Sequence, residues 1–320
     1  MRFFSPKVII PTVISLAIFF FLIGLSGRQT LFRALVLPPI QIGELVGLVL
    51  ISMIFQGATW FLFLRRLDVQ ATLPEIAFCF SGGAVAKNLP AGVFFQNYLL
   101  NRVMGAHVSY TAGASISLIA LEGVVTFFFL LVLGLPSAPW LRWALGLIAS
   151  VSILIILASW HHQLPNRLLN WGRQHHHPRI QQAAQEIDHF VSGLRILMAV
   201  HLLTPGMLLI AAFLAAQGLT LYVICTHLPI PQMGILPSMD VLAFSIFLPI
   251  IFPFPIQFGF TEVSGVAAMM AFGASQPKAI AAMLSFRLWG LGLSIILGLL
   301  GMLMFPEQMK KALVSSSDKD

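Results

Sequence analysis

The stretch Ile251-Phe-Pro-Phe-Pro-Ile-Gln-Phe-Gly-Phe-Thr-Glu-Val-Ser-Gly265 lies within a long apolar segment, yet it contains two prolines, a glycine and a carboxylate. The prolines remove backbone amide donors and end a helix, and the glycine gives the chain room to turn. In a bilayer, freed backbone groups are tolerated only where protein or water surrounds them. The stretch therefore predicts two half-helices, 241–252 and 260–273, that meet at an elbow inside the protein.

The carboxylate of this stretch, Glu262, is the first candidate functional group. A carboxylate near the middle of a membrane costs on the order of 2.5–3.5 kcal/mol, so a partner is expected. Arg287 is the nearest candidate because it lies inside the last apolar run, Ala279 to Phe305. The second half-helix would also point its positive N-terminal end at the elbow, which suits an anionic group. The alternative is a proline-kinked helix in which Glu262 is hydrogen-bonded to a neighbour.

The composition places the whole chain among polytopic membrane proteins. Of its 320 residues, 58% are hydrophobic and 9% are charged, which leaves no sizeable soluble domain. The net charge of +7 is interpreted as a sign of membrane topology and anionic-lipid contact, not of nucleic-acid binding. Cys79 and Cys225 lie in separate apolar runs and are expected to be buried core residues without a disulfide or a metal.

The apolar runs predict an all-α polytopic membrane protein. Each spanning run is close to the roughly 20 residues that a membrane helix needs. Two further runs, 76–104 and 241–273, are broken in the middle, the first by Lys87-Asn-Leu-Pro-Ala-Gly92. We therefore expect about six spanning helices plus two re-entrant helical hairpins. The expected spans are 8–25, 42–64, 109–134, 141–159, 201–225 and 279–305.

The basic residues predict how these segments are oriented. If both ends of 76–104 lie on one side, most of the Lys and Arg residues fall on that side, which the positive-inside rule assigns to the cytoplasm. The second hairpin then opens to the outside, and both termini are cytoplasmic. The residues on the cytoplasmic side are Arg2, Lys7, Arg65, Arg66, Arg102, Arg167, Arg173, Arg179, Arg195, Lys310, Lys311 and Lys319.

Two oppositely oriented hairpins, each followed by a full span, predict an inverted repeat within a single membrane domain. Aligning Ala114 with Ala279 places Glu122 opposite Arg287. Many secondary transporters have this architecture and bind substrate at the repeat interface. The expected parts are a first helix and outer loop (1–41), a first repeat half (42–134), a connecting helix, basic loop and amphipathic helix (135–200), a second repeat half (201–306) and a charged tail (307–320).

Four charged residues are expected inside the membrane: Lys87, Glu122, Glu262 and Arg287. They either pair with one another as internal ion bridges or line a polar cavity. Burying such pairs is costly, which favours a cavity in which Lys87, with Asn88 beside it, and Arg287 meet an anionic head group. Asp240 is expected in the outer loop before the second hairpin. No catalytic, metal-binding or phosphate-binding motif is present, so we expect neither an enzyme nor a cofactor.

The run Leu248 to Glu262, the run Ala271-Phe-Gly-Ala-Ser275 and the Arg287-Leu pair resemble the pattern of the lysylphosphatidylglycerol synthase transmembrane, or flippase-like, family. The resemblance assigns Pro255, Gly259, Glu262 and Arg287 to the substrate site. The first half departs from the family, because Leu89 to Asn97 replaces a Pro-Gly-x-x-Gly turn that an acidic residue and an arginine usually follow.

The resemblance implies movement of a lipid or lipid-linked head group between leaflets of a bacterial inner membrane. Cargo in the family includes aminoacylated or anionic phospholipid, polyprenyl phosphate and hopanoid. An alternative is a non-catalytic accessory subunit of a lipid-synthesising enzyme or glycosyltransferase. A third hypothesis, an ion-coupled carrier of small solutes, lacks a recognisable cation site.

Overall fold

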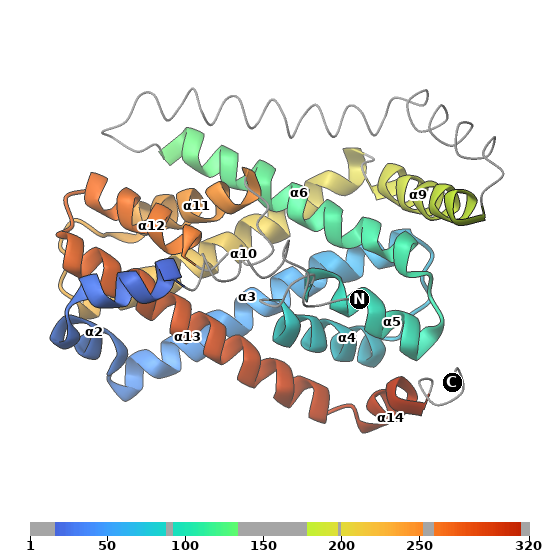
Figure 1. Ribbon diagram of the computed structural model, residues 1–320, viewed down its shortest axis with the longest axis horizontal. Coiled ribbons are helices and arrows are strands. Elements are labelled where there is room, and N and C mark those ends of the chain that lie inside the picture. Colours follow the sequence, from blue (N-terminus) through green and yellow to red (C-terminus); the bar gives the residue numbers. More distant parts are fainter. Residues whose placement is uncertain (1–16, 88–91, 134–177, 198–199, 252–258, 315–320) are drawn as a thin grey trace.

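The computed structural model describes residues 17–87, 92–133, 178–197, 200–251 and 259–314, and all regular structure in these ranges is helical (Figure 1). Four helices are long and apolar enough to cross a membrane: α3 (Pro39–Arg66), α6 (Val108–Leu133), α10 (Val200–His227) and α13 (Gln276–Leu303). The predicted fold class, an all-α polytopic membrane protein, is confirmed. The predicted span 141–159 lies outside the described residues, and so does the first half of span 8–25.

Two pairs of shorter helices occupy the places predicted for the broken segments. Hairpin one consists of α4 (Leu73–Ala86), the 3-10 turn η1 (Gly92–Phe94) and α5 (Phe95–Met104). Hairpin two consists of α11 (Ile235–Ile251) and α12 (Phe260–Ala271). In each hairpin the two helices pack against each other, and the break falls where the prolines predicted it.

The two hairpins enter the bundle from opposite ends, because the helices that precede them are antiparallel. The side chain of Gln217 on α10 donates a hydrogen bond to Ser52 on α3, and Gly206 lies against Phe63. Residue numbers therefore increase along α10 in the direction in which they decrease along α3, so the two helices are antiparallel. Hairpin one follows the C-terminal end of α3 and hairpin two follows that of α10, so the hairpins point toward each other (Figure 1).

A glutamate in the first turn caps the N-terminus of one helix in each hairpin. At α4, the Glu75 carboxylate accepts hydrogen bonds from the backbone amide of Thr72 at 3.0 Å and from its hydroxyl at 2.8 Å. At α12, the Glu262 carboxylate accepts the backbone amide of Gly259 at 2.6 Å. In both cases a glutamate in the first turn satisfies the amide three residues earlier, which otherwise has no partner within the helix. Gly259 adopts φ 87°, which glycine reaches without strain.

Helix α11 begins six residues before the predicted half-helix, so the expectation for Asp240 was wrong. Asp240 lies inside α11 and is 3% exposed, instead of in an outer loop. The segment 229–239 contains three prolines and a glycine, which are typical of a loop. Pro237 falls in the first turn of α11, where backbone amides lack intrahelical partners, so proline does not interrupt the helix there.

Two segments expected to be irregular are partly helical. The expected outer loop contains α2 (Arg28–Leu35), and the helix over 17–26 meets it at a bend of 103°. Gly27, at φ 73°, occupies the bend. The expected tail begins with α14 (Pro306–Val314), which packs against α4 and α5.

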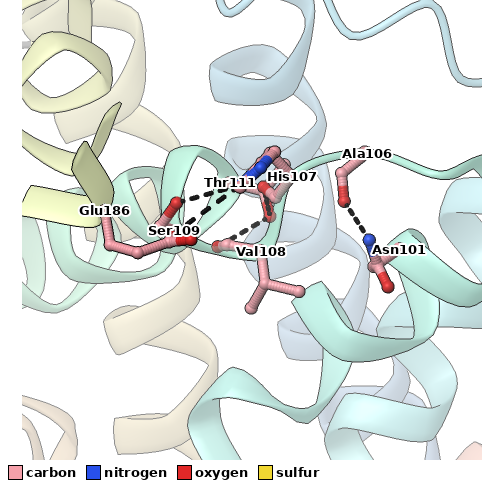
Figure 2. Close-up of polar contacts among 7 residues, drawn as sticks. All are labelled: Asn101, Ala106, His107, Val108, Ser109, Thr111 and Glu186. Carbon is pink, nitrogen blue, oxygen red and sulfur yellow. Dashed lines mark hydrogen bonds and ion pairs between the residues drawn. The ribbon is translucent and has the colours of Figure 1, made fainter. Parts of the chain in front are cut away.

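Helix α9 (Pro178–Leu197) is the amphipathic helix predicted after the basic loop, and it packs along α6. The helices approach closely because Gly193 faces the backbone of Tyr110, where a Cβ atom would lie 2.9 Å from the carbonyl oxygen. Figure 2 shows Glu186 of α9 beside His107, with 3.8 Å between Oε2 and Nδ1. Both Cys79 and Cys225 are buried, as expected.

The apolar core is divided between the hairpins. One cluster of buried side chains includes Ile76, Phe78 and Leu100 of hairpin one, and the other includes Val241 and Met269 of hairpin two. Each hairpin is therefore held by its own close-packed apolar contacts, which stabilise helices inside a membrane through van der Waals packing. Polar residues collect in the space between the hairpins.

Candidate functional site

A cavity of about 260 Å³ lies among α3, α4, α5, α6, α10, α11, α12 and α13. Both hairpins and all four long helices contribute to its wall. Lys87 follows directly after α4 and is exposed, so the cavity reaches the protein surface there. The polar residues of the wall are Ser52, Gln56, Lys87, Gln96, Ser115, Glu122, Gln217, Ser245, Thr261, Arg287 and Ser294.

On one wall, Gln56 of α3 stands between an acid and a base. Its Nε2 donates to Glu122 Oε1 at 2.6 Å, and its Oε1 accepts from Lys87 Nζ at 3.4 Å. A carboxylate only accepts and an ammonium only donates, so these two contacts determine how the amide is oriented. Lys87 also lies 5.7 Å from the ring centre of Phe213, within cation–π range. Gln56 therefore separates Lys87 from Glu122 while contacting both.

On the opposite wall, Glu262 and Arg287 form an ion pair, with Glu262 Oε1 at 3.3 Å from Arg287 Nε. The other oxygen, Oε2, accepts the Gly259 amide. Glu262 is 1% exposed and is not part of the cavity wall, whereas the Arg287 side chain is 20% exposed and is part of it. Glu262 therefore contacts Arg287 on the side that faces away from the cavity, and the guanidinium reaches the cavity wall.

The side-chain contact between hairpin one and the following long helix is made by neutral groups, whereas that of hairpin two is an ion pair. Asn97 and Gln96, in the first turn of α5, donate to the Ser115 hydroxyl at 2.8 Å and 3.0 Å. Asn97 is fully buried. The contact joins α5 to α6 just as the Glu262–Arg287 pair joins α12 to α13.

A single offset of 165 residues relates these positions. It is the offset between Ala114 and Ala279, and it also separates Asn97 from Glu262 and Glu122 from Arg287. The same offset separates the ends of α4 and α11, and the starts of α5 and α12. Ser52 and Gln217 are 165 residues apart as well, and they are hydrogen-bonded to each other. The division of the chain into repeat halves stays a prediction, and these correspondences are the features on which it rests.

The structure places the predicted site residues as follows. Lys87, Glu122 and Arg287 line the cavity, and Gly259 and Glu262 lie directly behind Arg287. Asn88 and Pro255 lie outside the described residues.

Sequence reasoning missed Gln56 and Gln217, which also line the cavity. Each is an amide in the middle of an apolar run, and polar residues inside membrane helices tend to face a protein interior or a cavity. That signal was present in the sequence.

The family model described as the lysylphosphatidylglycerol synthase TM region matches residues 8–298. The chain belongs to this family. The matched region contains every residue that lines the cavity, from Ser52 to Ser294. The chain is thus an integral membrane protein of the lysylphosphatidylglycerol synthase or flippase-like kind, and membership in this family suggests that it interacts with membrane lipids. No curated protein sequence matches the chain.

Proposed function

We propose that this protein moves the polar head group of a lipid, or of a lipid-linked anionic group, between the two leaflets of the membrane. The cavity carries the proposal, because it presents Glu122 and Arg287 in the interior of an otherwise apolar bundle and Lys87 where the cavity reaches the surface. Transfer of an ionised group into an apolar medium is prohibitively costly unless protein groups replace the lost water. The charged and hydroxylated wall supplies such groups.

The size of the cavity fits a head group better than a whole lipid. At about 260 Å³ it falls just below the range of roughly 300–1,000 Å³ that pockets for drug-sized ligands occupy. Acyl or prenyl chains would remain in the bilayer while the head group enters. Because the cavity reaches the surface at Lys87, we expect that ammonium to meet an incoming phosphate first and Arg287 to hold it farther inside.

The opposed hairpins supply a route to both leaflets. In transporters with two related halves, substrate binds where the halves meet, and access alternates as one half moves against the other. The cavity wall contains residues from both hairpins, among them Gln96 and Thr261. We expect each hairpin to re-enter the membrane from its own side and to control access to the cavity from that side. No catalytic reaction is part of the proposal.

The basic residues give the proposal an orientation. Arg65 and Arg66 end α3, Arg102 is in the last turn of α5, and Lys311 of α14 contacts Glu75 at the start of α4. These groups share one end of the bundle, which the positive-inside rule assigns to the cytoplasm of a bacterial inner membrane.

An accessory-subunit role is the second candidate, and one observation favours it. Glu262 is almost completely buried and contacts Arg287 and the Gly259 amide, which also fits a purely structural ion pair. In that case the chain would hold or deliver lipid to a lipid-synthesising enzyme without moving it between leaflets.

A leaflet-exposure assay in liposomes distinguishes the two. Purified protein is reconstituted with fluorescent lipids that carry anionic, aminoacylated, polyprenyl-phosphate or hopanoid head groups. Head-group-selective movement that Arg287→Gln abolishes supports the proposal. Arg33→Gln is the matched control, because Arg33 is exposed and lies outside the cavity wall. Folded protein that moves none of these lipids contradicts the proposal and supports the accessory role.

A further inference from the structure

Asp240 is a buried carboxylate that the proposed head-group site does not use. It is 3% exposed, and it is not among the residues of the cavity wall. Its Oδ1 atom has no hydrogen-bond donor in the described part of the chain. None of the ion pairs formed there includes Asp240 either.

Its counterpart in hairpin one is Glu75, which precedes it by the same 165 residues that relate the other paired positions. Glu75 accepts hydrogen bonds from the amide and hydroxyl of Thr72 and from Lys311 Nζ at 3.3 Å. These contacts suit an ionised carboxylate. At the corresponding position in hairpin two, the Asp240 carboxylate has no such contact within the described part of the chain.

The titratable groups near Asp240 do not compensate for this loss. Helix α11 packs against α6, α10 and α12. None of the hydrogen bonds or ion pairs between described residues joins Asp240 to a titratable side chain of these helices. The titratable residues in the sequences of these helices are Tyr110 and Glu122 on α6, His201, Tyr222, Cys225 and His227 on α10, and Glu262 on α12.

We infer that Asp240 is a proton-binding site, and that in this conformation it is a neutral carboxylic acid. A buried carboxylate without a cation or donors is unfavourable when ionised and becomes neutral by taking up a proton. A metal ion would need several oxygen ligands, and no group of three metal-ligating side chains occurs in the described ranges. A proton needs one oxygen, which Asp240 supplies.

The position of Asp240 allows its protonation to be coupled to movement of hairpin two. Asp240 is in the second turn of α11, the first helix of hairpin two. If hairpin two opens toward its own end of the bundle, water reaches the carboxylate, which then releases its proton and ionises. A proton gradient would therefore shift the balance between closed and open forms. This coupling rests on the proposed transport function, whereas the proton-binding site itself does not.

Infrared difference spectroscopy of the purified protein tests the site without any transport. The carbonyl band of a protonated carboxylic acid is expected at neutral pH and should be absent from Asp240→Asn. Glu75→Gln is the matched control and should keep the band, because Glu75 is already supported as an ion. A neutral-pH spectrum in which Asp240→Asn equals the native protein overturns the inference.

Coupling is tested in the liposomes by imposing a pH difference across the membrane. The gradient should accelerate lipid movement by the native chain and by Glu75→Gln, and this acceleration should be lost in Asp240→Asn. Equal acceleration in Asp240→Asn overturns the coupling. If the native chain moves no lipid at all, the proposed function fails, and the infrared result still decides whether Asp240 carries a proton.

Discussion

Hairpin one and hairpin two occupy equivalent places in the bundle, but different chemistry attaches each to the following long helix. In hairpin one, Asn97 and Gln96 share the neutral hydroxyl of Ser115. In hairpin two, Glu262, which follows Asn97 by the offset of 165 residues, forms an ion pair with Arg287. A buried charge without its partner costs far more than a lost neutral hydrogen bond. The comparison teaches that removing one partner of the contact should cost more stability at hairpin two, where a buried charge is left unpaired, than at hairpin one, where a neutral hydrogen bond is lost.

The largest expected effect comes from breaking the ion pair. Arg287→Gln leaves the Glu262 carboxylate buried without its cation, which should lower the free energy of unfolding by about 3–5 kcal/mol and abolish lipid movement. Thermal unfolding in detergent and the leaflet assay measure the two effects.

The double variant Glu262→Gln/Arg287→Gln separates structure from function. Removing both charges should restore most of the stability, because no unpaired charge remains. Lipid movement should stay absent, since the cavity still lacks its guanidinium. Recovery of movement together with stability would show that the pair is only structural.

A smaller effect is expected at Gln56, on the wall opposite the ion pair. Gln56→Leu removes the donor to Glu122 and the acceptor for Lys87. Hydrogen bonds to charged groups contribute about 1.5–3 kcal/mol, so lipid movement should fall by roughly 10- to 100-fold. Because Lys87 can then approach Glu122, the selectivity among head groups should change as well, as competition between fluorescent lipids would reveal. Leu118→Met, another substitution of a cavity residue, should leave the rate nearly unchanged.

The neutral contact of hairpin one should be cheaper to remove. Asn97→Ala takes away one of two donors to Ser115, and Gln96 still satisfies that hydroxyl. The expected loss of unfolding free energy is about 1–2 kcal/mol, well below that of Arg287→Gln. Chemical unfolding in detergent compares the two variants directly. A loss as large as that of Arg287→Gln would contradict the difference between the hairpins.

The smallest expected effect on stability concerns the start of hairpin one, at Glu75 in the first turn of α4, and it depends on pH. Burial raises the pKa of Glu75, but hydrogen bonds from Thr72 and Lys311 outweigh it, so this pKa lies below its ordinary value of 4.5. The resulting stability is present above pH 4.5 and is lost as the pH falls through the lowered pKa.

Lys311→Met tests this contact. The Lys311 side chain is 55% exposed, so the loss at neutral pH should be less than about 1 kcal/mol. The difference from the native protein should shrink as the pH falls below the lowered pKa of Glu75. Lys310→Met is the control and should show no such pH dependence. A Lys311→Met effect that is the same at acid and neutral pH would exclude the ion pair as its cause.

Much of the fold followed from local features of the sequence. Apolar runs of membrane length predicted the long helices, and the proline and glycine breaks predicted both hairpins to within a few residues, except at the start of α11. These features act along the chain, because hydrophobic length, missing amide donors and glycine conformations are properties of neighbouring residues. Glu262 and Arg287 were paired for a related reason, since a charge inside a membrane requires a partner.

The sequence by itself therefore determined a helical membrane protein with two broken segments and a short set of interior charges. Only the tertiary structure decided which of those charges meet. It placed Gln56 between Lys87 and Glu122 and brought Lys311 to Glu75 from 236 residues away. It also left Asp240 without a hydrogen-bond donor to Oδ1 or an ion pair among the described residues. The physical reason is that hydrogen bonds and ion pairs depend on positions in space within a few ångströms, and the packing of distant helices sets those positions.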